Sequence, residues 1–551
     1  MRTVTQIVAI WMLAGGLMVP PLAAQQTSQT APGQILNRIA PVGPANSSRA
    51  RDGVLDVTLL PDPLLTRQPV VHEAQTGPAD VQLRHWWARR SAAGLAGIVY
   101  DNRDRGHSTG PMVFPQVSKT LYAPVFKNSM LDYGIAGRVR FSLPVIGNSS
   151  TAITSGPTWR SQARAALQSP AAALLAYQLY ATNALYFYPE HRDHDRPSGD
   201  MFFANTPYFW VSQGSSGSDR PFMINALRAI AALPPETRHL AEEKHLLPAT
   251  VQMILRSTMA GVEGRAGYLS GAAHPSAFDA KRLDPLAVVG RAHALKASDL
   301  PPMVRLRVLA DFTALPGVDY LARNLDEVLF TTPSAIARAW RSYAYRRDIV
   351  LSAAETEDPN GRPLRFHWVL LRGDPNRIQI APADPAGQSA RITIAWHDRY
   401  TLPSPPGLDT SRIDIGIFAD NGAEISAPAF FSVTFPTFQN RIYTPGEDGE
   451  LRLARLTYAG DSRAQETYAD PMIWPVAPWS DRFERDSDGW IRKIERTQKN
   501  GTIRTLEPGL FGPVLIQPDG QTVPIAHSAQ RDKTGVLRLR VDTQGTPTPD
   551  Q

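Results

Sequence analysis

Alternating apolar and polar residues mark short strands in three parts of the chain. The clearest runs are residues 137–143, 364–368 and 489–497. A period of two puts successive side chains on opposite faces, so each run predicts a strand with one buried face. The last run leads into Asn500-Gly501 and a second β-like run, which predicts a hairpin.

Apolar residues at helical spacing predict helices between about residues 159 and 346. Ser169-Pro170 is typical of a helix start, because serine caps free backbone N–H groups and proline suits the first turn. Asp219 is placed in the same way before another helix. Thr332-Pro333 precedes a helical pattern over residues 333–343. This stretch therefore predicts a mainly helical domain.

These patterns, with the changes in composition between them, predict a multidomain α+β chain. No internal repeat of fixed period is present. The predicted segments, in order, are a signal peptide (1–24), a flexible linker (25–51), a β-rich segment (52–158), a mainly helical domain (159–346), a β-sandwich (347–436), a C-terminal β segment built of hairpins (437–542) and a disordered tail (543–551). The β-rich segment and the helical domain together are compatible with one α+β unit.

The predicted sandwich carries three features of a known module. Residues 358–361 form an Asp-Pro-Asn-Gly turn, Phe366-His367-Trp368 follows as an aromatic-x-Trp strand, and Asp420-Asn421-Gly422 is a late turn. Together they resemble a PKD-type immunoglobulin-like β-sandwich. The resemblance implies an accessory module of the kind carried by secreted enzymes and surface proteins. Because Trp368 ends the alternating strand, we predict that it is buried between the two sheets.

The N-terminus predicts export. Met1-Arg2 is followed by an apolar run over residues 7–22 and by small residues before Gln25, as in a secretory signal peptide. An uncleaved anchor is the alternative, but Gly and Pro pairs interrupt the run and it is short for a membrane span. No later segment is apolar enough to span a bilayer. We therefore expect a periplasmic or secreted protein with no stable membrane span after cleavage.

Composition excludes several classes of site. The 551 residues include no cysteine, which rules out disulfides, thiol catalysis and thiolate metal ligands. The net charge of +6 comes from basic residues interspersed with acidic ones, whereas a nucleic-acid binder concentrates them on one stripe. The chain also lacks a phosphate-binding Gly-rich loop and a dinucleotide fingerprint. We expect no nucleic-acid partner.

The densest polar cluster lies over residues 186–195. His191, Asp193 and His194 supply imidazoles and a carboxylate suited to general acid–base catalysis. In a metal-dependent alternative these three residues and Asp195 would bind a divalent metal, the cofactor being otherwise unknown. The spacing is not that of a His-Glu-x-x-His metalloprotease motif. The competing interpretation is a solvated charged turn after a helix.

A Gly/Ser-rich loop over residues 212–219 follows shortly afterwards. Ser215 or Ser216 would act as nucleophile if His191 or His194 folds back onto the loop, and the next helix N-terminus would hold an anion. The alternative is an N-capping loop in which Asp219 serves the helix. The candidate substrate contacts, which the same pattern allows as core residues, are Asn205, Tyr208, Trp210 and Asp219.

Three weaker candidates complete the set. Residues 101–108 and 147–151 are polar clusters interpreted first as turns and second as walls of a site. Residues 484–495 match the spacing of a calcium-binding EF-hand loop. The strand pattern that follows Gly489 favours a plain Asp-Gly turn, because an EF-hand needs a helix there.

The leading functional hypothesis is an exported hydrolase acting on an extracytoplasmic polymer, either polysaccharide or peptide. It rests on the signal peptide, the accessory-like sandwich and the polar loops. The alternative is a non-catalytic secreted binding or surface-assembly protein that carries a PKD-like module. For the hydrolase we predict that loops 190–195 and 212–219 form two walls of one cleft.

Overall fold

A six-stranded parallel sheet organises the first part of the chain. The computed structural model of the protein describes residues 39–543 apart from 108–112, 136–137, 154–159, 196–198, 317–318, 321, 323–324, 403–406, 459–477, 510–511 and 532–536. In sheet order the strands are β1 (Ile39–Val42), β5 (Ser118–Tyr122), β4 (Val99–Asn102), β7 (Val145–Asn148), β10 (Ala184–Pro189) and β13 (Phe209–Ser212). Every neighbouring pair runs parallel. The predicted signal peptide and the predicted tail after residue 543 lie outside the described residues.

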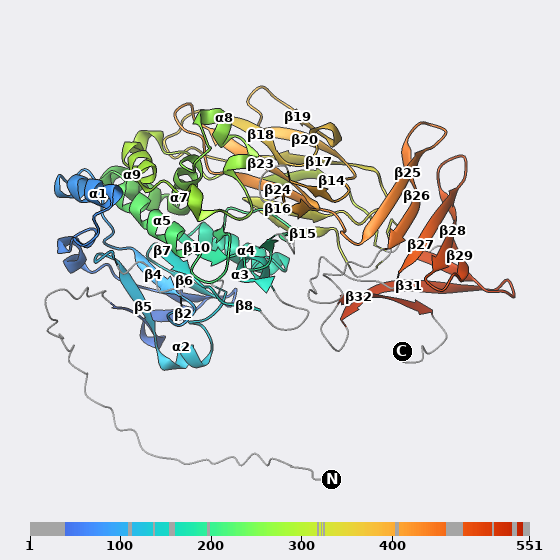
Figure 1. Cartoon of the computed structure of the whole chain (residues 1–551), viewed down its shortest axis with the longest axis horizontal. Coiled ribbons are helices and arrows are strands. Elements are labelled where there is room, and N and C mark those ends of the chain that lie inside the picture. Colours follow the sequence, from blue (N-terminus) through green and yellow to red (C-terminus); the bar gives the residue numbers. More distant parts are fainter. Residues whose placement is uncertain are drawn as a thin grey trace, which may run out of the picture. The chain divides into compact units, whose positions relative to one another are not determined.

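Helices cover both faces of this sheet. On one face, α5 (Arg220–Ala232) contacts β7 and β10, and Phe222 of this helix packs on Trp210 of β13. On the other face, α3 (Gln162–Ala165) and α4 (Pro170–Tyr180) contact β10. Two further helices, α7 (Leu247–Ser257) and α9 (Pro285–Ala294), contact α5. The three helices lie side by side in Figure 1. The predicted cap is confirmed at Ser169, whose hydroxyl accepts from the Ala172 N–H of α4 at 3.2 Å.

The remaining elements of this part are short. The helices are α1 (Pro78–Ala88), α2 (Pro124–Asn128), α6 (Pro235–Glu243) and α8 (Gly264–Tyr268). The small sheets pair β2 (Ser47–Arg49), β3 (Leu55–Val57) and β6 (Val139–Phe141), then β8 (Ala152–Ile153) with β9 (Arg160–Ser161), and β11 (His194–Asp195) with β12 (Gly199–Asp200). None of the helices in the described part of the chain is long and apolar enough to cross a bilayer.

Two sheets packed face to face follow. One contains β14 (Arg307–Asp311), β17 (Arg346–Ser352), β20 (Ser389–Ala395) and β19 (Ile378–Pro382) in that order. The other contains β15 (Val328–Thr332), β16 (Ala335–Ala339), β24 (Ala429–Thr434), β23 (Arg412–Asp420) and β18 (Arg365–Arg372), with β21 (Tyr400–Thr401) and β22 (Asp409–Thr410) paired apart from them. Ile349, Ile392, Ile415 and Phe431 are among the buried residues of their shared core. A β-sandwich is therefore present, although its relation to PKD modules stays a prediction.

The sandwich extends beyond its predicted start. Strands β14, β15 and β16 precede residue 347, so that boundary falls inside the two sheets. The segment over 333–343 was expected as a helix and instead contains β16. Its Pro start and helical spacing are local signals, but β16 lies between β15 and β24 and all five of its residues are buried. Tertiary strand pairing outweighs local propensity here.

Trp368 is only partly buried, which corrects the prediction that it is buried between the two sheets. It lies two residues after Phe366, on the same face of β18, and packs against the sandwich core. The buried apolar residue of this strand is Phe366, at 7% exposure. The indole N–H of Trp368 donates to the Gly387 carbonyl oxygen at 2.7 Å. The alternating pattern thus places β18 and its core-facing side correctly but overestimates how deeply Trp368 is buried.

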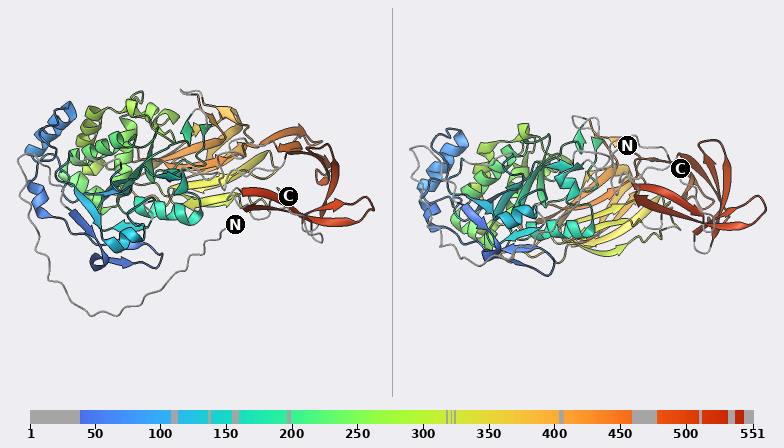
Figure 2. Two further views of the ribbon diagram at one scale, coloured as in Figure 1. Left: turned by 60° about the horizontal axis from the view of Figure 1, so that its bottom comes forward. Right: turned by 90° about the horizontal axis from the view of Figure 1, so that it is seen from below.

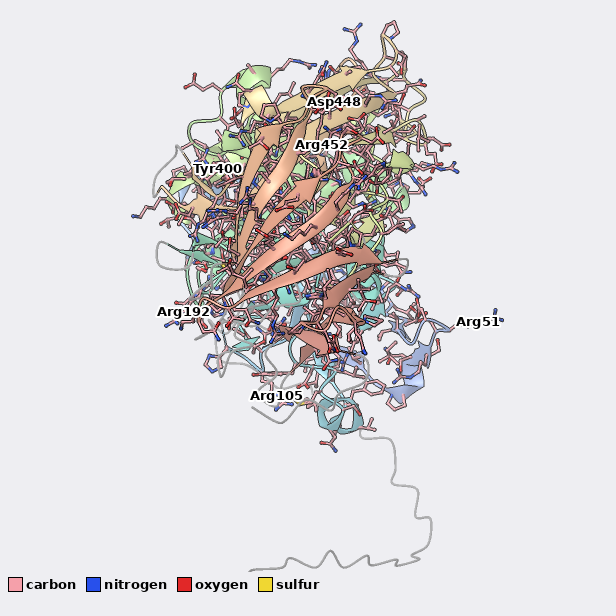
Figure 3. All side chains as sticks on the ribbon, turned by 90° about the vertical axis from the view of Figure 1, so that its right-hand side faces the viewer. Arg51, Arg105, Arg192, Tyr400, Asp448 and Arg452 are labelled. Atoms are coloured by element: carbon pink, nitrogen blue, oxygen red, sulfur yellow. The ribbon has the colours of Figure 1, made fainter. Side chains whose placement is uncertain are left out.

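The C-terminal part is an antiparallel meander. Its strands are β25 (Gln439–Pro445), β26 (Leu451–Tyr458), β27 (Trp479–Arg485), β28 (Ile491–Gln498), β29 (Ile503–Gly509), β30 (Gly512–Ile516), β31 (Thr522–Arg531) and β32 (Leu537–Thr543), each paired with the next and drawn orange to red in Figure 2. The predicted hairpin is confirmed, with Gly501 at φ +83° between β28 and β29. An extended strand also follows Gly489, as the plain-turn interpretation requires. Figure 3 labels Asp448 and Arg452, whose side chains pair at 2.7 Å beside the turn between β25 and β26.

Two segment predictions were drawn from composition and need correction. Residues 25–51 were expected to be a linker, but β1 and β2 fall within them and β1 joins the parallel sheet. Residues 159–346 were expected to be mainly helical, but they contain β10 and β13 of the same sheet. All side chains of β10 and β13 are buried. Strands buried on both faces lose the alternation that identifies a strand, which explains the error.

Candidate functional site at the carboxyl edge of the parallel sheet

Polar residues gather where the central parallel strands end. Asp101 and Asn102 end β4, Asn148 ends β7, and Glu190 directly follows β10. All four are at least nine-tenths buried. In open α/β sheets, ligands bind outside the carboxyl ends of the strands. Buried polar groups at this edge therefore form the candidate site.

Asp101 is the acceptor at the centre of the first group. Its carboxylate accepts from Thr120 Oγ1 at 2.9 Å, Tyr122 OH at 3.0 Å and Tyr186 OH at 2.6 Å. Arg103 lies 3.5 Å from it and is equally buried. Burial, and next the charge of Asp101, raises the pKa of Tyr186, so this hydroxyl remains a hydrogen-bond donor. A buried carboxylate is stable only with such partners.

Glycine in β7 permits the contact between Tyr186 and Asp101. Asp101, Gly147 and Tyr186 stand in register across β4, β7 and β10. A Cβ built on Gly147 would press on Cε1 of Tyr186 and lie 2.6 Å from its Cδ1. The tyrosine ring therefore lies over the position where any other residue would carry a side chain. This close approach is the reason that β7 has glycine here.

Asp219 does not perform the capping role that its position suggests. It stands at the N-cap of α5, but its side chain makes no capping hydrogen bond. Its Oδ2 instead accepts from Asn148 Nδ2 at 2.8 Å, and the side chain is fully buried. Burial raises its pKa and the negative charge of Asp104 adds to this effect, while the Asn148 bond opposes it. Asp219 is thus a buried carboxyl group held near a second one.

Asp104 is the second carboxyl group. Its Oδ2 accepts from the N–H of Ser150 at 3.1 Å and from its hydroxyl at 2.7 Å. The other oxygens, Oδ1 of Asp104 and Oδ1 of Asp219, are buried without a hydrogen bond of normal geometry to a described residue. Each carboxyl group therefore has one oxygen left for a further partner.

The two predicted loops do lie side by side. The N–H of His191 donates to the Gly214 carbonyl oxygen at 3.0 Å, and Oε1 of Glu190 accepts from the Gly214 N–H at 2.5 Å. His194 is buried, and its N–H donates to Oε2 of Glu190 at 3.2 Å. Loops 190–195 and 212–219 are thus joined by Glu190, which the sequence interpretation did not single out.

The imidazole of His191 contacts the backbone of Ser150 and not the serine-rich loop. Its Nε2 lies 2.9 Å from the carbonyl oxygen of Ser150, and burial lowers its pKa. The residue has φ +54°, in the left-handed region that non-glycine residues seldom adopt. Ser215 and Ser216 are exposed, and the Ser215 carbonyl accepts from the Ser218 N–H. The serine version of the site stays a prediction.

Asp193 serves as an anchor for α3. Its Oδ2 accepts from the Ser161 N–H at 3.0 Å and from the Ser161 hydroxyl, while Arg164 lies 4.0 Å from its Oδ1. Among the described residues no group of three or more His, Asp or Glu side chains is arranged to hold a metal ion. The side chain of Asp195 lies outside the described part, so the divalent-metal alternative stays a prediction.

The predicted substrate contacts separate into different environments. Trp210 is fully buried and stacks on Phe278 at 3.8 Å between ring centres, so it belongs to the core. Asn205 donates its side-chain amide to the His274 carbonyl oxygen and its backbone N–H to Ser432 Oγ, which makes it a bridge to β24. Tyr208 is buried and bonds to Thr332, yet it also lines a cavity.

On sequence alone, Asp101, Asp104 and Asn148 are weaker site candidates than the two loops, because each lies in a cluster with turn composition. Their position was the signal that could have identified them as site residues, since each cluster directly follows a strand. Their convergence required knowing that β4 and β7 are parallel neighbours.

Comparisons with known proteins provide no family. No family model matches the chain, and no curated protein matches its sequence. One similar solved structure is described as a nucleoside hydrolase-related hypothetical protein from Saccharophagus degradans that is associated with carbohydrate metabolism. It shares 13% identity over 53% of this chain and 71% of that chain, with a TM-score of 0.17. A TM-score this low carries neither the fold nor the function across.

Proposed function

We propose that this protein is an exported hydrolase acting on an extracytoplasmic polymer, with Asp219 as its acid–base group. The observation that carries the proposal is the placement of Asp219: a helix-cap position, a buried side chain turned to Asn148, and a raised pKa with Asp104 nearby. A carboxyl group that keeps its proton nearer to neutral pH is suited to protonate a leaving group.

The chemistry fits a pair of carboxyl groups with different tasks. Protonated Asp219 donates its proton to the leaving oxygen as the scissile bond breaks. Asp104 takes a proton from the attacking water, so the two protons balance. Two carboxyl groups in these roles are the usual means of glycoside hydrolysis, which favours polysaccharide over peptide as the polymer.

The residues of the two loops are an alternative set of catalytic residues for the same hydrolase. His191, Asp193, His194, Ser215 and Ser216 would act in place of the carboxyl pair if a serine nucleophile operates. The contacts of His191 with Ser150 and of Asp193 with Ser161 give both residues positioning partners instead. The carboxyl pair therefore receives the greater support.

The test is hydrolysis of a panel of polysaccharides and peptides by the mature protein and by Asp219→Asn. Loss of an acid–base group should lower turnover by about 10²–10⁴-fold. The matched control is Asp284→Asn, because Asp284 caps α9 conventionally by accepting from the Leu286 and Ala287 N–H groups. Asparagine caps equally well, so this variant should retain activity.

Two results would count against the proposal. Full turnover in Asp219→Asn would remove Asp219 from the chemistry, and Ser215→Ala would then decide on the serine version. Saturable polymer binding with no cleavage of any substrate would favour the non-catalytic binding protein.

A further inference from the structure

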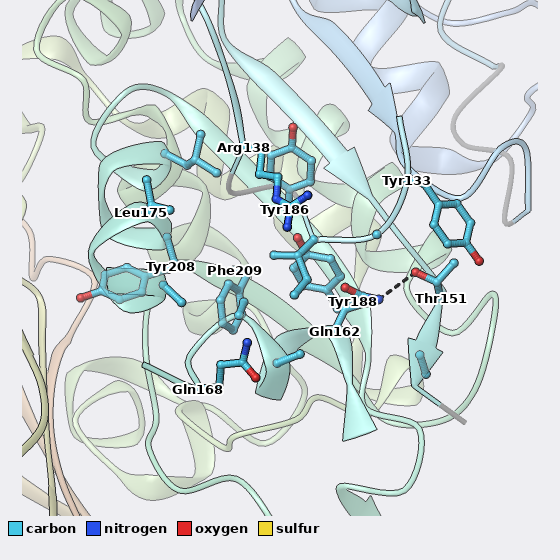
Figure 4. A pocket seen from close by; sticks show the side chains of 18 of the residues that line it. Tyr133, Arg138, Thr151, Gln162, Gln168, Leu175, Tyr186, Tyr188, Tyr208 and Phe209 are labelled. Carbon is cyan, nitrogen blue, oxygen red and sulfur yellow. Dashed lines mark hydrogen bonds between the residues drawn. The ribbon is translucent and has the colours of Figure 1, made fainter. Parts of the chain in front are cut away.

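An aromatic cavity lies between α4 and the parallel sheet. It has a volume of about 440 Å³. Ala172, Leu175 and Ala176 of α4 line it together with Tyr186 and Tyr188 of β10. Figure 4 labels Leu175 and the two tyrosines. The volume falls within the about 300–1,000 Å³ typical of small-molecule sites.

Aromatic rings from the parallel sheet line the cavity. Tyr186 and Tyr188 lie on the same face of β10 with their rings nearly parallel, at an interplanar angle of 12°. Phe209 of β13 meets Tyr188 edge-on, with ring centres 5.6 Å apart, and Tyr208 lies next to it in sequence. Such rings offer flat apolar surface to a ring-shaped ligand while their hydroxyls remain polar.

Gln162 lines this cavity, and a chain of hydrogen bonds sets the orientation of its side-chain amide. Ser149 Oγ donates to the Arg103 carbonyl oxygen, so Thr151 Oγ1 must donate to Ser149 Oγ at 2.8 Å. Thr151 Oγ1 therefore accepts from Gln162 Nε2 at 2.9 Å, the dashed line of Figure 4.

The remaining amide oxygen has no hydrogen-bond partner in the described part of the chain. Gln162 is 8% exposed, and its Oε1 makes no hydrogen bond to a described residue. Leaving a buried acceptor unsatisfied costs free energy. A ligand that enters the cavity should therefore present a hydroxyl or N–H donor to this oxygen.

The charge of the cavity lining is one-sided. Of the described residues that line it, Arg138 is cationic and none is acidic. Arg138 is exposed, directly precedes β6, and forms no ion pair with another described residue. Arginine pairs well with carboxylates, so the ligand should carry a negative charge at the cavity mouth.

We propose that this cavity binds an acidic sugar ring, a hexuronate unit, stacked on Tyr188 with a hydroxyl donated to Gln162 Oε1 and its carboxylate at Arg138. A plain aromatic acid satisfies the rings and the charge but has no donor for Gln162. A neutral sugar satisfies the rings and Gln162 but leaves Arg138 unpaired. The hexuronate meets all three requirements.

The inference does not require hydrolysis. The cavity lining meets the carboxylate network at Tyr186, whose hydroxyl donates to Asp101. Asp219 is not among the described residues that line the cavity. Binding can therefore be measured whether or not the polymer is cleaved.

The test is calorimetric titration of the full-length mature protein with hexuronate oligosaccharides, neutral oligosaccharides of the same length, and benzoate. We expect saturable binding of the hexuronate only. Gln162→Leu and Arg138→Ala should each weaken it by about tenfold or more. Matched controls are Gln379→Leu on β19 and Arg51→Ala, both exposed positions outside the cavity, which should leave it unchanged.

Three outcomes would overturn the proposal. These are no saturable hexuronate binding, equal binding of the neutral sugar with no effect of Arg138→Ala, and equal binding of benzoate with no effect of Gln162→Leu. Because Arg138 is exposed, its replacement should not disturb folding. The Arg138→Ala variant therefore still tests the proposal if Gln162→Leu fails to fold.

Discussion

Replacing Gly147 by alanine tests whether the Tyr186–Asp101 contact holds the sheet edge together. The added Cβ would press on Cε1 of Tyr186 and stand 2.8 Å from the carbonyl oxygen of Asp101. The backbone oxygen belongs to the neighbouring strand, so β7 cannot shift away from the ring without disturbing its pairing with β4. The Tyr186 ring must move instead and lose its hydrogen bond to Asp101.

The expected cost combines two effects. Forcing an extra methyl group into a packed interior costs about 1–3 kcal/mol. Losing a hydrogen bond to a buried charged group costs about 1.5–3 kcal/mol. Gly147 has no positive φ, so alanine adds no backbone strain. We expect Gly147→Ala to lower the free energy of unfolding by about 3–5 kcal/mol.

The assay is urea denaturation followed by fluorescence and far-UV circular dichroism. Gly290→Ala is the matched control, because Gly290 lies inside α9 and a Cβ there meets nothing within 4 Å. It should be neutral or stabilise by about 0.5–1 kcal/mol, since alanine favours helix. Adding Tyr186→Ala to Gly147→Ala should recover the overpacking part. A Gly147→Ala variant within 0.5 kcal/mol of the unaltered protein would refute the packing argument.

Three further predictions follow from other parts of the structure. Trp396→Ala should destabilise the sandwich by about 3–5 kcal/mol, because Trp396 is 2% exposed. Trp368→Ala should cost clearly less, because Trp368 is only partly buried. Equal losses of stability in thermal unfolding would contradict this difference. The raised pKa of Asp219 means that the folded state binds its proton more tightly than the unfolded chain, so stability should fall as pH rises from about 4 through that pKa. Asp219→Asn should remove this loss and be at least as stable at pH 7, and an unchanged pH profile in denaturation would argue against the buried carboxyl group. N-terminal sequencing of material from the native host should find a start near Gln25, and intact Met1 in a soluble cytoplasmic fraction would rule out export.

Local chemistry was sufficient for the elements whose signals lie within a few residues. The Ser169-Pro170 helix start and the Asn500-Gly501 hairpin depend on caps and turn conformations that neighbouring residues specify. The alternation in residues 364–368 located β18 as well. Alternation does not measure how deeply a face is covered, which is why it misassigned the burial of Trp368.

The sequence by itself therefore determined the absence of thiol chemistry, the hairpins, the helix start at Ser169-Pro170, and the proximity of two polar loops that flank one strand pair. Only the tertiary structure decided that β4, β7 and β10 are parallel neighbours, and hence that Asp101, Asn148 and Asp219 share one edge. The physical reason is twofold. Strands covered on both faces carry no periodic signal of their own. Parallel neighbours are joined by long crossovers, so the residues that meet at their ends are far apart in sequence.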